Sequence, residues 1–302
     1  MGELKPACWQ GEYCLQQPLA PHTSWRVGGC ADAFFSPASL DELVRFLQGN
    51  PGVPLFWLGL GSNLLVRDGG IRGTVISLRQ GLSVLREEQG LIYVEAGVPC
   101  AKVAKFCQRL GGDNLAFLGG IPGTMGGALA MNAGAFGAET WDFVERVVTI
   151  NRMGVIACRD PSSFVIHYRQ VDGLNQEAFI GAWLRVAAQG GSAINDLLKD
   201  RNQKQPIGLP SGGSVFRNPP GDYAGRLIEA AGLKGYQQGG AQVSPKHANF
   251  IINLGQASAW DIEGLILHIQ AVVKAHAHIV LQPEVHIVGD YLPGQGQGAS
   301  KA

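Results

Sequence analysis

Two glycine-rich stretches of the sequence could bring bare backbone against a ligand. The longer one, at positions 119–137, reads GGIPGTMGGALAMNAGAFG and holds seven glycines in nineteen residues. Glycine loses more backbone freedom on folding than any other residue, so this density indicates a close approach of the backbone to a ligand. Pro122 fixes one φ angle and gives the loop a defined shape. Interleaved apolar residues such as Met125 and Phe136 argue against a solvated linker.

The second stretch is the turn GLGSN at 59–63, between the apolar segments 55–58 and 64–66. Backbone N–H groups in such a turn can form a concave anion site. The spacing is not the dinucleotide fingerprint, because Leu64 stands where a third glycine is needed, and no Gly-Lys-Ser/Thr follows as in a P-loop. Taken alone, the turn is equally an ordinary connection between strands. Two such loops in one chain favour a long cofactor that contains a diphosphate.

The helices and strands that must position these loops are expected to form an α+β fold, because helices and short strands do not alternate strictly along the sequence. Ser39 is the expected N-cap of the first helix, with Glu42 at its third position. We expect residues 1–20 to form an irregular lead-in. The stretch 206–220 is rich in Pro, Gly and Ser and indicates a domain boundary. Helices are expected at 40–47, 101–110, 195–203, 223–231 and 259–276, and strands at 55–58, 74–78, 91–95, 144–151, 155–159, 178–188, 249–253 and 283–288.

Composition narrows the class of protein. Of 302 residues, 46% are hydrophobic and 16% charged, which is typical of a compact globule. Lys plus Arg equals Asp plus Glu, at 24 each, so we expect neither nucleic-acid nor membrane binding. The N-terminus lacks a signal peptide pattern, and the six cysteines form neither a CxxC pair nor a Cys/His set. We therefore expect a cytoplasmic protein with reduced thiols and no metal, in which Cys100 and Cys107 face inward on one helix.

Short blocks carry a resemblance to a known family. They are TSWRVGG at 23–29, GLGSN at 59–63, GIPGT at 120–124, MNAGA at 131–135, YR at 168–169, GSVFRNP at 213–219, AGLKG at 231–235, VSPKHANF at 243–250 and PEV at 283–285. In this order they resemble the UDP-N-acetylenolpyruvoylglucosamine reductases, flavoenzymes of bacterial peptidoglycan precursor synthesis. The chain departs from the family pattern at Leu60, Val171 and His286, and these departures concern secondary contacts. No long insertion separates Arg169 from Ser214, so the chain resembles the shorter type without an extra tyrosine-bearing loop.

The resemblance implies a fold and a reaction. The fold is a two-subdomain FAD-binding fold of the vanillyl-alcohol oxidase type with a C-terminal α+β substrate domain. The expected boundaries are a lead-in at 1–19, FAD-binding subdomains at 20–80 and 81–200, a substrate domain at 201–290 and a disordered tail at 291–302. The reaction is reduction of UDP-N-acetylglucosamine enolpyruvate to UDP-N-acetylmuramate, with NADPH as hydride donor and non-covalent FAD. No side chain supplies hydride, so a cofactor is required. No obligate protein partner is expected.

Three residues are implied as catalytic. Arg169 offers a permanently charged fork to the substrate carboxylate, where negative charge grows. Glu284, if burial raises its pKa and keeps it protonated, donates a hydrogen bond to the same group. Ser214 donates the proton to the carbanion carbon. Judged singly, Arg169 is better explained as part of a surface ion pair, Glu284 as a rim charge and Ser214 as a turn hydroxyl. The family blocks around them reverse that judgement.

The family blocks also imply binding residues. For the cofactor these are Gly59, Gly61, Ser62, Asn63, Gly120, Ile121, Pro122, Gly123, Thr124, Asn132 and Gly134. For the substrate they are Tyr168, Asn218 and Lys204, the last near the diphosphate. We interpret His247 as a structural, hydrogen-bonded histidine.

Two other functions stay open. One is a different FAD-dependent oxidoreductase of the same fold; such enzymes often attach the flavin through His or Cys, and the 119–137 loop holds neither. The other is an inactive ligand-binding homologue, against which the retention of Arg169, Ser214 and Glu284 argues.

Overall fold

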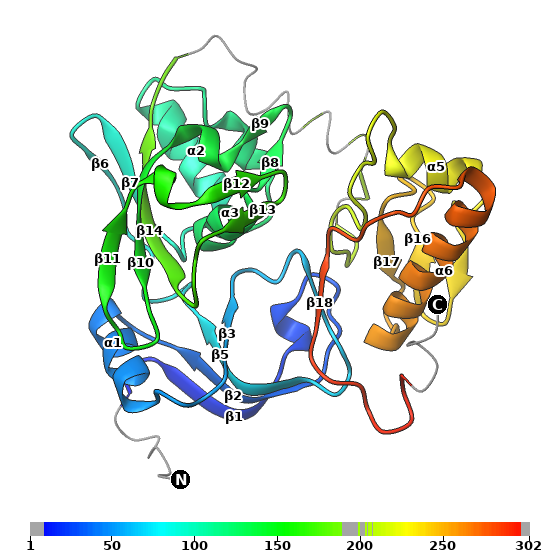
Figure 1. The fold of residues 1–302 in the computed structure, drawn as a ribbon, viewed down its shortest axis with the longest axis horizontal. Coiled ribbons are helices and arrows are strands. Elements are labelled where there is room, and N and C mark those ends of the chain that lie inside the picture. The colour runs from blue at the N-terminus through cyan, green and yellow to red at the C-terminus, as the bar shows by residue number, and fades with distance from the viewer. Residues whose placement is uncertain (1–8, 189–198, 200–202, 204, 207, 297–302) are drawn as a thin grey trace. The chain divides into compact units, whose positions relative to one another are not determined.

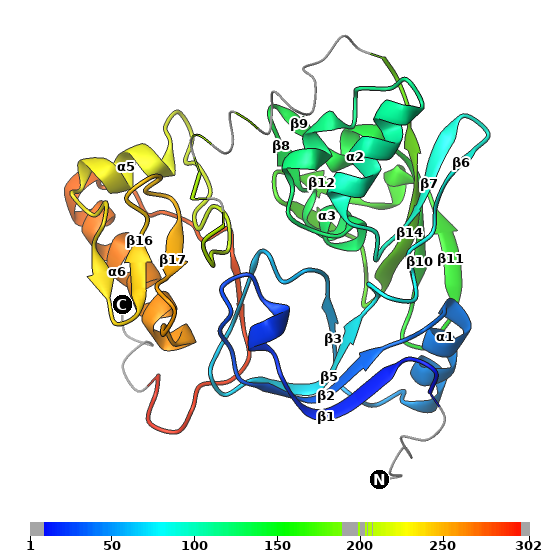
Figure 2. The same cartoon turned by 180° about the vertical axis from the view of Figure 1, so that it is seen from behind.

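The computed structural model describes residues 9–188, 199, 203, 205–206 and 208–296 (Figures 1 and 2). The chain folds into two compact units. Unit 1 comprises Met1–Leu15, Ala33–Leu60 and Gly73–Arg201, and unit 2 comprises Gln16–Asp32, Gly61–Arg72 and Asn202–Ala302. Each unit is therefore assembled from segments that are far apart in the sequence.

A four-stranded sheet has the order β1 (Glu12–Pro18), β2 (Cys30–Ser36), β5 (Ile71–Ser77) and β3 (Leu55–Leu58). Strands β3 and β5 are parallel. Helix α1 (Leu40–Gly49) begins after Ser39, whose side chain accepts a hydrogen bond from the Glu42 N–H, as expected for an N-cap. The buried face of α1 packs on this sheet, with the Phe46 ring stacked on Phe35 at 4.3 Å.

A five-stranded antiparallel sheet forms the larger part of unit 1. Its order is β11 (Ile156–Arg159), β10 (Val144–Ile150), β14 (Ala178–Arg185), β7 (Leu91–Glu95) and β6 (Leu85–Glu88). Helices α2 (Cys100–Arg109) and α3 (Met125–Met131) lie along one side of it (Figures 1 and 2). Between and after the helices come the 3₁₀ turns η3 (Ala116–Gly120), η4 (Thr140–Phe143) and η5 (Pro161–Ser163) and the hairpins β8 (Gly134–Ala135)–β9 (Ala138–Glu139) and β12 (Val165–His167)–β13 (Gln170–Asp172).

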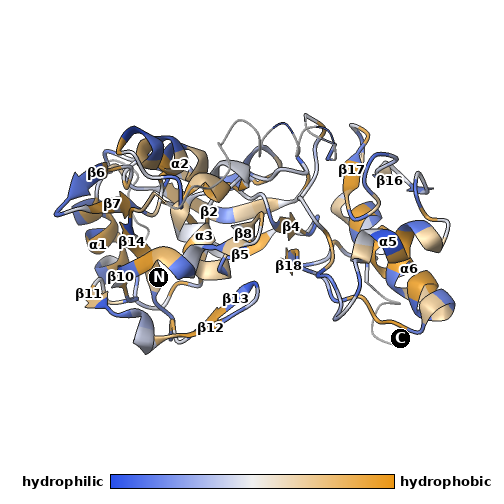
Figure 3. Cartoon of the chain, turned by 90° about the horizontal axis from the view of Figure 1, so that it is seen from above, coloured by the Kyte–Doolittle hydropathy of each residue, from blue (hydrophilic) through white to orange (hydrophobic). Residues whose placement is uncertain are grey.

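Unit 2 contains helices α5 (Ala224–Ala230) and α6 (Ala259–Ala277) and a small antiparallel sheet of β15 (Gln237–Gln238), β16 (Ala241–Val243) and β17 (Ile251–Asn253). Strand β4 (Leu64–Val66) pairs in parallel with β18 (His286–Val288), and η2 (Ala20–His22) precedes Trp25. Apolar colour runs along much of α6 in Figure 3, in keeping with its buried Ile and Leu residues. The fully buried Trp25 donates its indole N–H to the Ile251 carbonyl at 2.8 Å.

Most predicted elements are confirmed. The helices expected at 40–47, 101–110, 223–231 and 259–276 are α1, α2, α5 and α6, and the strands at 55–58 and 91–95 match β3 and β7 residue for residue. Cys100 and Cys107 are both buried on α2, and burial raises the pKa of Cys100 to about 12. The predicted helix at 195–203 lies largely outside the described residues.

Two expectations about local structure are wrong. The lead-in is not irregular over Glu12–Pro18, which form β1 and pair with the nearby strand β2. All residues of β1 are exposed or only partly buried, so no buried apolar face marks this strand in the sequence. The glycine-rich stretch contains the helix α3 rather than only loop. Glycine disfavours helices, but here packing outweighs propensity: Met125, Ala128 and Leu129 are buried, and a Cβ on Gly126 would come within 2.9 Å of the Ala96 Cβ.

Candidate functional site

A cavity of about 150 Å³ lies within unit 1. Its lining comes from β3, β5, α3, the turn after β7 and the start of β14. These residues are Trp57, Leu58, Gly59, Ile76, Leu78, Arg79, Ala96, Gly97, Thr124, Gly126, Gly127, Ala130, Leu174, Glu177, Ala178 and Phe179. The lining is mostly apolar side chains and bare backbone, with two charged groups. Such a cavity suits a flat, largely apolar group with a few polar atoms.

The glycines of this cavity serve two purposes. A Cβ on Gly97 would lie 2.2 Å from the Leu78 carbonyl oxygen, and one on Gly59 would lie 2.9 Å from the Thr124 Oγ1, so the fold itself needs these glycines. At Gly127 the nearest atom would be the same Oγ1 at 3.8 Å. Gly127 therefore leaves room for a ligand against the backbone of α3, and a cofactor of the predicted kind fits this lining.

The structure places the predicted cofactor residues in different surroundings. Gly59 and Thr124 line the cavity, whereas the predicted stretch from 120 to 123 is absent from its lining. A Cβ on Gly120 would meet the Phe136 ring at 2.6 Å, and one on Gly61 would meet the His22 carbonyl oxygen at 2.1 Å. The contact at Gly61 is with backbone, so packing within the protein explains that glycine, whereas Gly120 meets the end of a half-exposed side chain that can move aside.

Sequence reasoning missed several lining residues. Arg79, Gly97, Gly126 and Gly127 line the cavity without having been predicted. The adjacent glycines at 126 and 127, inside an apolar stretch, were the available signal.

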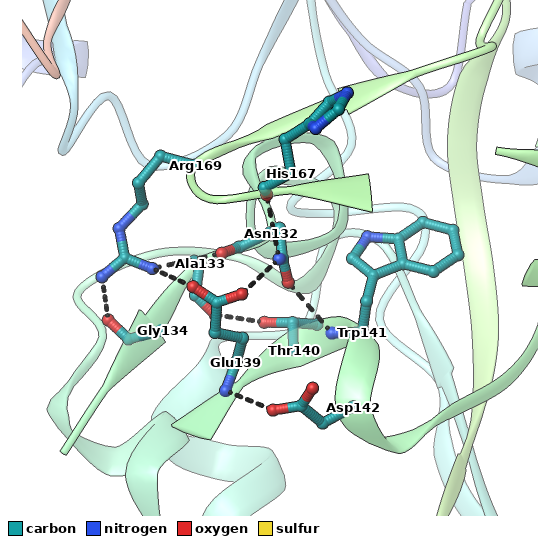
Figure 4. Close-up of polar contacts among 9 residues, drawn as sticks. All are labelled: Asn132, Ala133, Gly134, Glu139, Thr140, Trp141, Asp142, His167 and Arg169. Carbon is teal, nitrogen blue, oxygen red and sulfur yellow. Dashed lines mark hydrogen bonds and ion pairs between the residues drawn. The ribbon is translucent and has the colours of Figure 1, made fainter. Parts of the chain in front are cut away.

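Arg169 lies in a cluster of polar groups beside the β8–β9 hairpin (Figure 4). Its guanidinium donates from Nη1 to the Asn132 carbonyl at 3.2 Å and from Nη2 to the Gly134 carbonyl at 2.7 Å. The Glu139 Oε1 lies 3.6 Å from Nη1. The Arg169 backbone adopts a left-handed conformation, with φ of +58°, in the turn between β12 and β13. Because most residues avoid this conformation, the turn is held by its surroundings.

Asn132 organises this cluster. It is buried, caps α3 with a left-handed φ of +44°, and uses all parts of its amide. The Nδ2 group donates to the Glu139 Oε2 at 2.7 Å and to the His167 carbonyl at 3.1 Å, while Oδ1 accepts from the Trp141 N–H at 3.1 Å. Asn132 and Gly134, predicted to bind the cofactor, here hold the neighbourhood of Arg169. Tyr168 is about half exposed, with its ring centroid 4.8 Å from the Arg169 guanidinium carbon.

Ser214 and Glu284 come together in unit 2 through backbone pairing. The Glu284 N–H donates to the carbonyl of Val215, the residue after Ser214, at 2.8 Å. Asn63 holds the other side: its Nδ2 donates to the Glu284 carbonyl at 2.9 Å, and its own carbonyl accepts from the His286 N–H at 3.0 Å. Asn63, predicted as a cofactor contact, thus fixes the main chain on both sides of Val285.

The glycines before Ser214 have distinct causes. A Cβ on Gly212 would lie 2.5 Å from the Trp25 ring, so Gly212 allows close packing on that indole. Gly213 has φ of +75° in open surroundings, a conformation that glycine adopts without strain.

Asn249 anchors the segment that carries Ser214. Its side chain accepts from the Phe216 N–H at 3.0 Å and donates to the Phe216 carbonyl at 2.8 Å. His247 supports it, because His247 Nδ1 accepts the Asn249 N–H at 3.2 Å. Burial lowers the pKa of His247, and the positive charge of Lys234 lowers it further. The predicted hydrogen bonding of His247 is confirmed, and its structural role stays a prediction.

The other predicted substrate residues are only partly described. The Asn218 Oδ1 accepts the Ala224 N–H at 3.0 Å at the start of α5. Lys204 lies outside the described residues.

Over the described part of the chain, no group of three or more His, Cys, Asp or Glu residues could hold a metal ion. No helix within those residues is long and apolar enough to cross a bilayer.

Two family models match this chain. An FAD binding domain matches residues 31–158, and the C-terminal domain of UDP-N-acetylenolpyruvoylglucosamine reductase matches residues 205–288. Together they confirm the predicted fold class, an FAD-binding fold followed by a C-terminal α+β domain.

Relatives match over nearly the whole length. The UDP-N-acetylenolpyruvoylglucosamine reductase of Methylococcus capsulatus is 55% identical over 288 residues, covering 93% of this chain and 94% of the relative. That of Alkalilimnicola ehrlichii is 53% identical, with coverage of 93% and 96%. The crystal structure of the reductase from Thermus caldophilus superposes with a TM-score of 0.76 at 32% identity, covering 93% of this chain and 99% of that one.

Proposed function

Because the chain belongs to the UDP-N-acetylenolpyruvoylglucosamine reductase family, we propose that it reduces UDP-N-acetylglucosamine enolpyruvate to UDP-N-acetylmuramate with NADPH and FAD, in peptidoglycan precursor synthesis. The observation that carries this conclusion is 55% identity to a reductase of that name over 93% of the chain. A match of the C-terminal domain at 205–288 argues against a different FAD-dependent oxidoreductase, since that domain is particular to this family model.

The unit 1 cavity is the proposed site for part of the FAD. Gly59, Thr124 and Gly127 would face the cofactor with backbone and hydroxyl groups, and Arg79 would supply a positive charge. When bound, FAD supplies hydride transfer from NADPH to the terminal vinyl carbon of the substrate. The absence of His and Cys from 119–137 supports non-covalent binding.

Arg169, Ser214 and Glu284 carry the proposed chemistry of the protein itself. Hydride addition leaves negative charge on the carbon beside the substrate carboxylate, and the charge spreads into that carboxylate. Arg169 binds the carboxylate and gains interaction energy as its charge grows. Glu284, in its protonated form, donates a hydrogen bond to the same group, and Ser214 transfers its hydroxyl proton to the carbon.

Three residues complete the proposed substrate contacts. The Oδ1 of Asn218 is engaged by α5, so its NH₂ group is the part directed to the substrate. Tyr168 offers an exposed ring beside Arg169. Lys204 supplies a positive charge for the diphosphate.

The proposed domains are a lead-in at 1–19, FAD-binding subdomains at 20–80 and 81–200, a substrate domain at 201–290 and a tail at 291–302. The family-model boundaries at 31–158 and 205–288 are compatible with them. We place the enzyme in the cytoplasm, acting on small molecules without nucleic acid, membrane or an obligate protein partner. The balanced charge of the chain supports the expectation that it binds neither nucleic acid nor membranes.

The test is an assay of purified holoenzyme with NADPH and UDP-N-acetylglucosamine enolpyruvate. We expect NADPH oxidation that depends on this substrate and a product heavier by two hydrogen atoms; UDP-N-acetylglucosamine is the control. A flavoprotein that NADPH reduces but the enolpyruvyl compound does not reoxidise would support a different oxidoreductase. A colourless protein that binds the substrate would support an inactive homologue.

A further inference from the structure

Glu139, at the end of the β8–β9 hairpin, lies between Asn132 and Arg169, the cation proposed to bind the substrate carboxylate (Figure 4). One carboxylate oxygen, Oε2, accepts from the Asn132 Nδ2 at 2.7 Å. The other, Oε1, lies 3.6 Å from the Arg169 Nη1. Each carboxylate oxygen therefore faces a different partner, and neither the family blocks nor the mechanism above assigns this residue a role.

The direction of the Glu139 carboxylate is set by a rigid neighbour. The Asn132 amide is fixed by the His167 carbonyl and the Trp141 N–H, so the second Nδ2 hydrogen points to Glu139. The backbone of Glu139 is fixed as well, because its N–H donates to the Asp142 side chain at 2.9 Å in a capping box. Because both the backbone and the carboxylate of Glu139 are held, the negative charge stays in one place.

The Arg169 guanidinium has little freedom to move away. Neutral carbonyls of Asn132 and Gly134 fix its plane, and Glu139 adds a formal negative charge beside Nη1. A Cβ on Gly134 would lie 2.8 Å from Nη1 and 3.0 Å from the Glu139 Cγ, so the hairpin packs closely around both side chains. The Arg169 and Glu139 side chains are 15% and 31% exposed, which reduces the screening of their interaction by solvent.

We propose that Glu139 is a positioning residue for Arg169. This inference rests on the proposed function. Glu139 orients the guanidinium toward the substrate carboxylate and does not itself contact the substrate. A long arginine side chain loses considerable rotamer freedom when it is ordered, so a fixed anion that orders it beforehand lowers the cost of binding and of charge stabilisation.

The decisive experiment is a double-mutant cycle. Glu139→Gln keeps an oxygen that can accept from Asn132 but removes the charge facing Arg169. In the wild-type background we expect reoxidation of the flavin by the enolpyruvyl substrate to slow about tenfold, the scale typical of coupled neighbours. In the Arg169→Ala background the same change should alter that rate less than about twofold. Equal slowing in both backgrounds would show a structural role and overturn the proposal.

A matched control is present in the same unit. Glu145 pairs with Arg185 at 3.0 Å, and both side chains are about half exposed. Glu145→Gln removes an ion pair of the same chemistry away from Arg169, and we expect its reoxidation rate to equal that of the wild type. Thermal unfolding of each variant checks that the fold is retained. If Glu139→Gln does not fold, Glu139→Asp, which draws the carboxylate back from Nη1 by one methylene group, should slow reoxidation in the wild-type background but not in the Arg169→Ala background, and equal rates in Glu139→Asp and the wild type would overturn the proposal.

A second readout is independent of the reaction. The holoenzyme without substrate is treated with phenylglyoxal, and modification of the peptide containing Arg169 is followed by mass spectrometry. We expect Glu139→Gln to raise the modification rate of Arg169 several-fold and Glu145→Gln to leave it unchanged. If the wild type fails to reduce the enolpyruvyl substrate, the proposed function is wrong, yet this rate still tests the contact. An unchanged rate in Glu139→Gln overturns the inference whatever the reaction is.

Discussion

The two units hold their proposed reacting groups by different means. In unit 1, the guanidinium of Arg169 is held at its tip by two carbonyls and the Glu139 carboxylate. In unit 2, Ser214 and Glu284 are brought together by main-chain hydrogen bonds through Val215. The first arrangement depends on side-chain partners, and the second depends on the register of two extended segments.

This difference follows from the length of the side chains. An arginine tip lies several rotatable bonds from its backbone, so backbone geometry alone leaves it unplaced. Serine is short, and its hydroxyl position is largely decided once the backbone is fixed. We therefore expect unit 1 to be sensitive to changes around Arg169, whereas in unit 2 the Ser214 side chain itself should matter more than its neighbours.

The largest effect should come from Ser214→Ala. If Ser214 only donates the proton, flavin reduction by NADPH stays largely intact, while reoxidation by the substrate slows roughly a hundredfold or more. Ser214→Cys should recover part of the rate, since a thiol also carries a transferable proton. Stopped-flow absorbance of the flavin follows each half-reaction separately. Equal slowing of both would indicate a structural role instead.

Gly127→Val should remove most of the flavin from the purified protein. A branched side chain would enter the space that Gly127 leaves open in the cavity, on the side where the cofactor is proposed to lie. The flavin-to-protein absorbance ratio measures the loss. Gly52→Val, at a turn glycine with open space around it, is the control and should stay yellow. A fully flavin-loaded Gly127→Val would place the cofactor elsewhere.

Gly134→Ala should slow substrate-driven reoxidation about tenfold, the scale of a steric displacement next to a reacting group. The added methyl group would lie 2.6 Å from the Ala138 carbonyl oxygen and 2.8 Å from the Arg169 Nη1, so the guanidinium must shift. Stopped-flow kinetics at several substrate concentrations separate weaker binding from a slower step. Wild-type kinetics would mean that the hairpin relaxes without moving Arg169.

Asn63→Ala tests the backbone arrangement of unit 2 and should have a smaller effect. Losing the hydrogen bond to the Glu284 carbonyl should cost about 1 kcal/mol of unfolding free energy. The reoxidation rate should fall only a few-fold, because the Glu284 N–H still pairs with Val215. Denaturant unfolding and stopped-flow kinetics measure the two quantities. A loss of activity as large as that of Ser214→Ala would contradict placement by backbone register.

The smallest effect is a pH dependence of stability through His247. Its pKa is lowered in the folded state, so the unfolded chain binds the proton more tightly. The free energy of unfolding should therefore be at its full value above about pH 6.5 and fall as the pH drops from there through the folded pKa. Protonation of Nδ1 would also break the bond from the Asn249 N–H. The difference in melting temperature between wild type and His247→Gln, measured across this range, should shrink on acidification; a constant difference would exclude this linkage.

The sequence predicts local elements well and the clusters around Arg169 poorly. Ser39 and the apolar spacing after it predict helix α1, and a short apolar run predicts strand β3. The family blocks single out Arg169, Asn132 and Gly134 but give no sign that these form one cluster with Glu139. That cluster depends on how the hairpins β8–β9 and β12–β13 pack, which no local spacing records.

The glycines show the same limit of prediction from the sequence. Their density correctly indicates close approach of backbone, but at Gly61, Gly120 and Gly212 the approaching group belongs to the protein itself. Only the surroundings of each glycine separate a tight internal contact from a ligand site, and those surroundings come from distant segments. Gly127, whose open space marks the cavity, has no feature in the sequence that distinguishes it from its neighbour Gly126.

The burial of Trp25 has a consequence for the order in which the chain is made. Its hydrogen-bond partner Ile251 lies 226 positions later, and Asn253 closes the other side by donating to the Trp25 carbonyl at 2.8 Å. At a synthesis rate of up to about 20 residues per second, this indole waits at least about 11 s for its partner to leave the ribosome. Meanwhile the continuous stretch of unit 1 that ends at Arg201 is already complete. A nascent chain halted before Ile251 therefore carries an unburied tryptophan, the kind of surface that chaperones bind and that directs stalled chains toward aggregation.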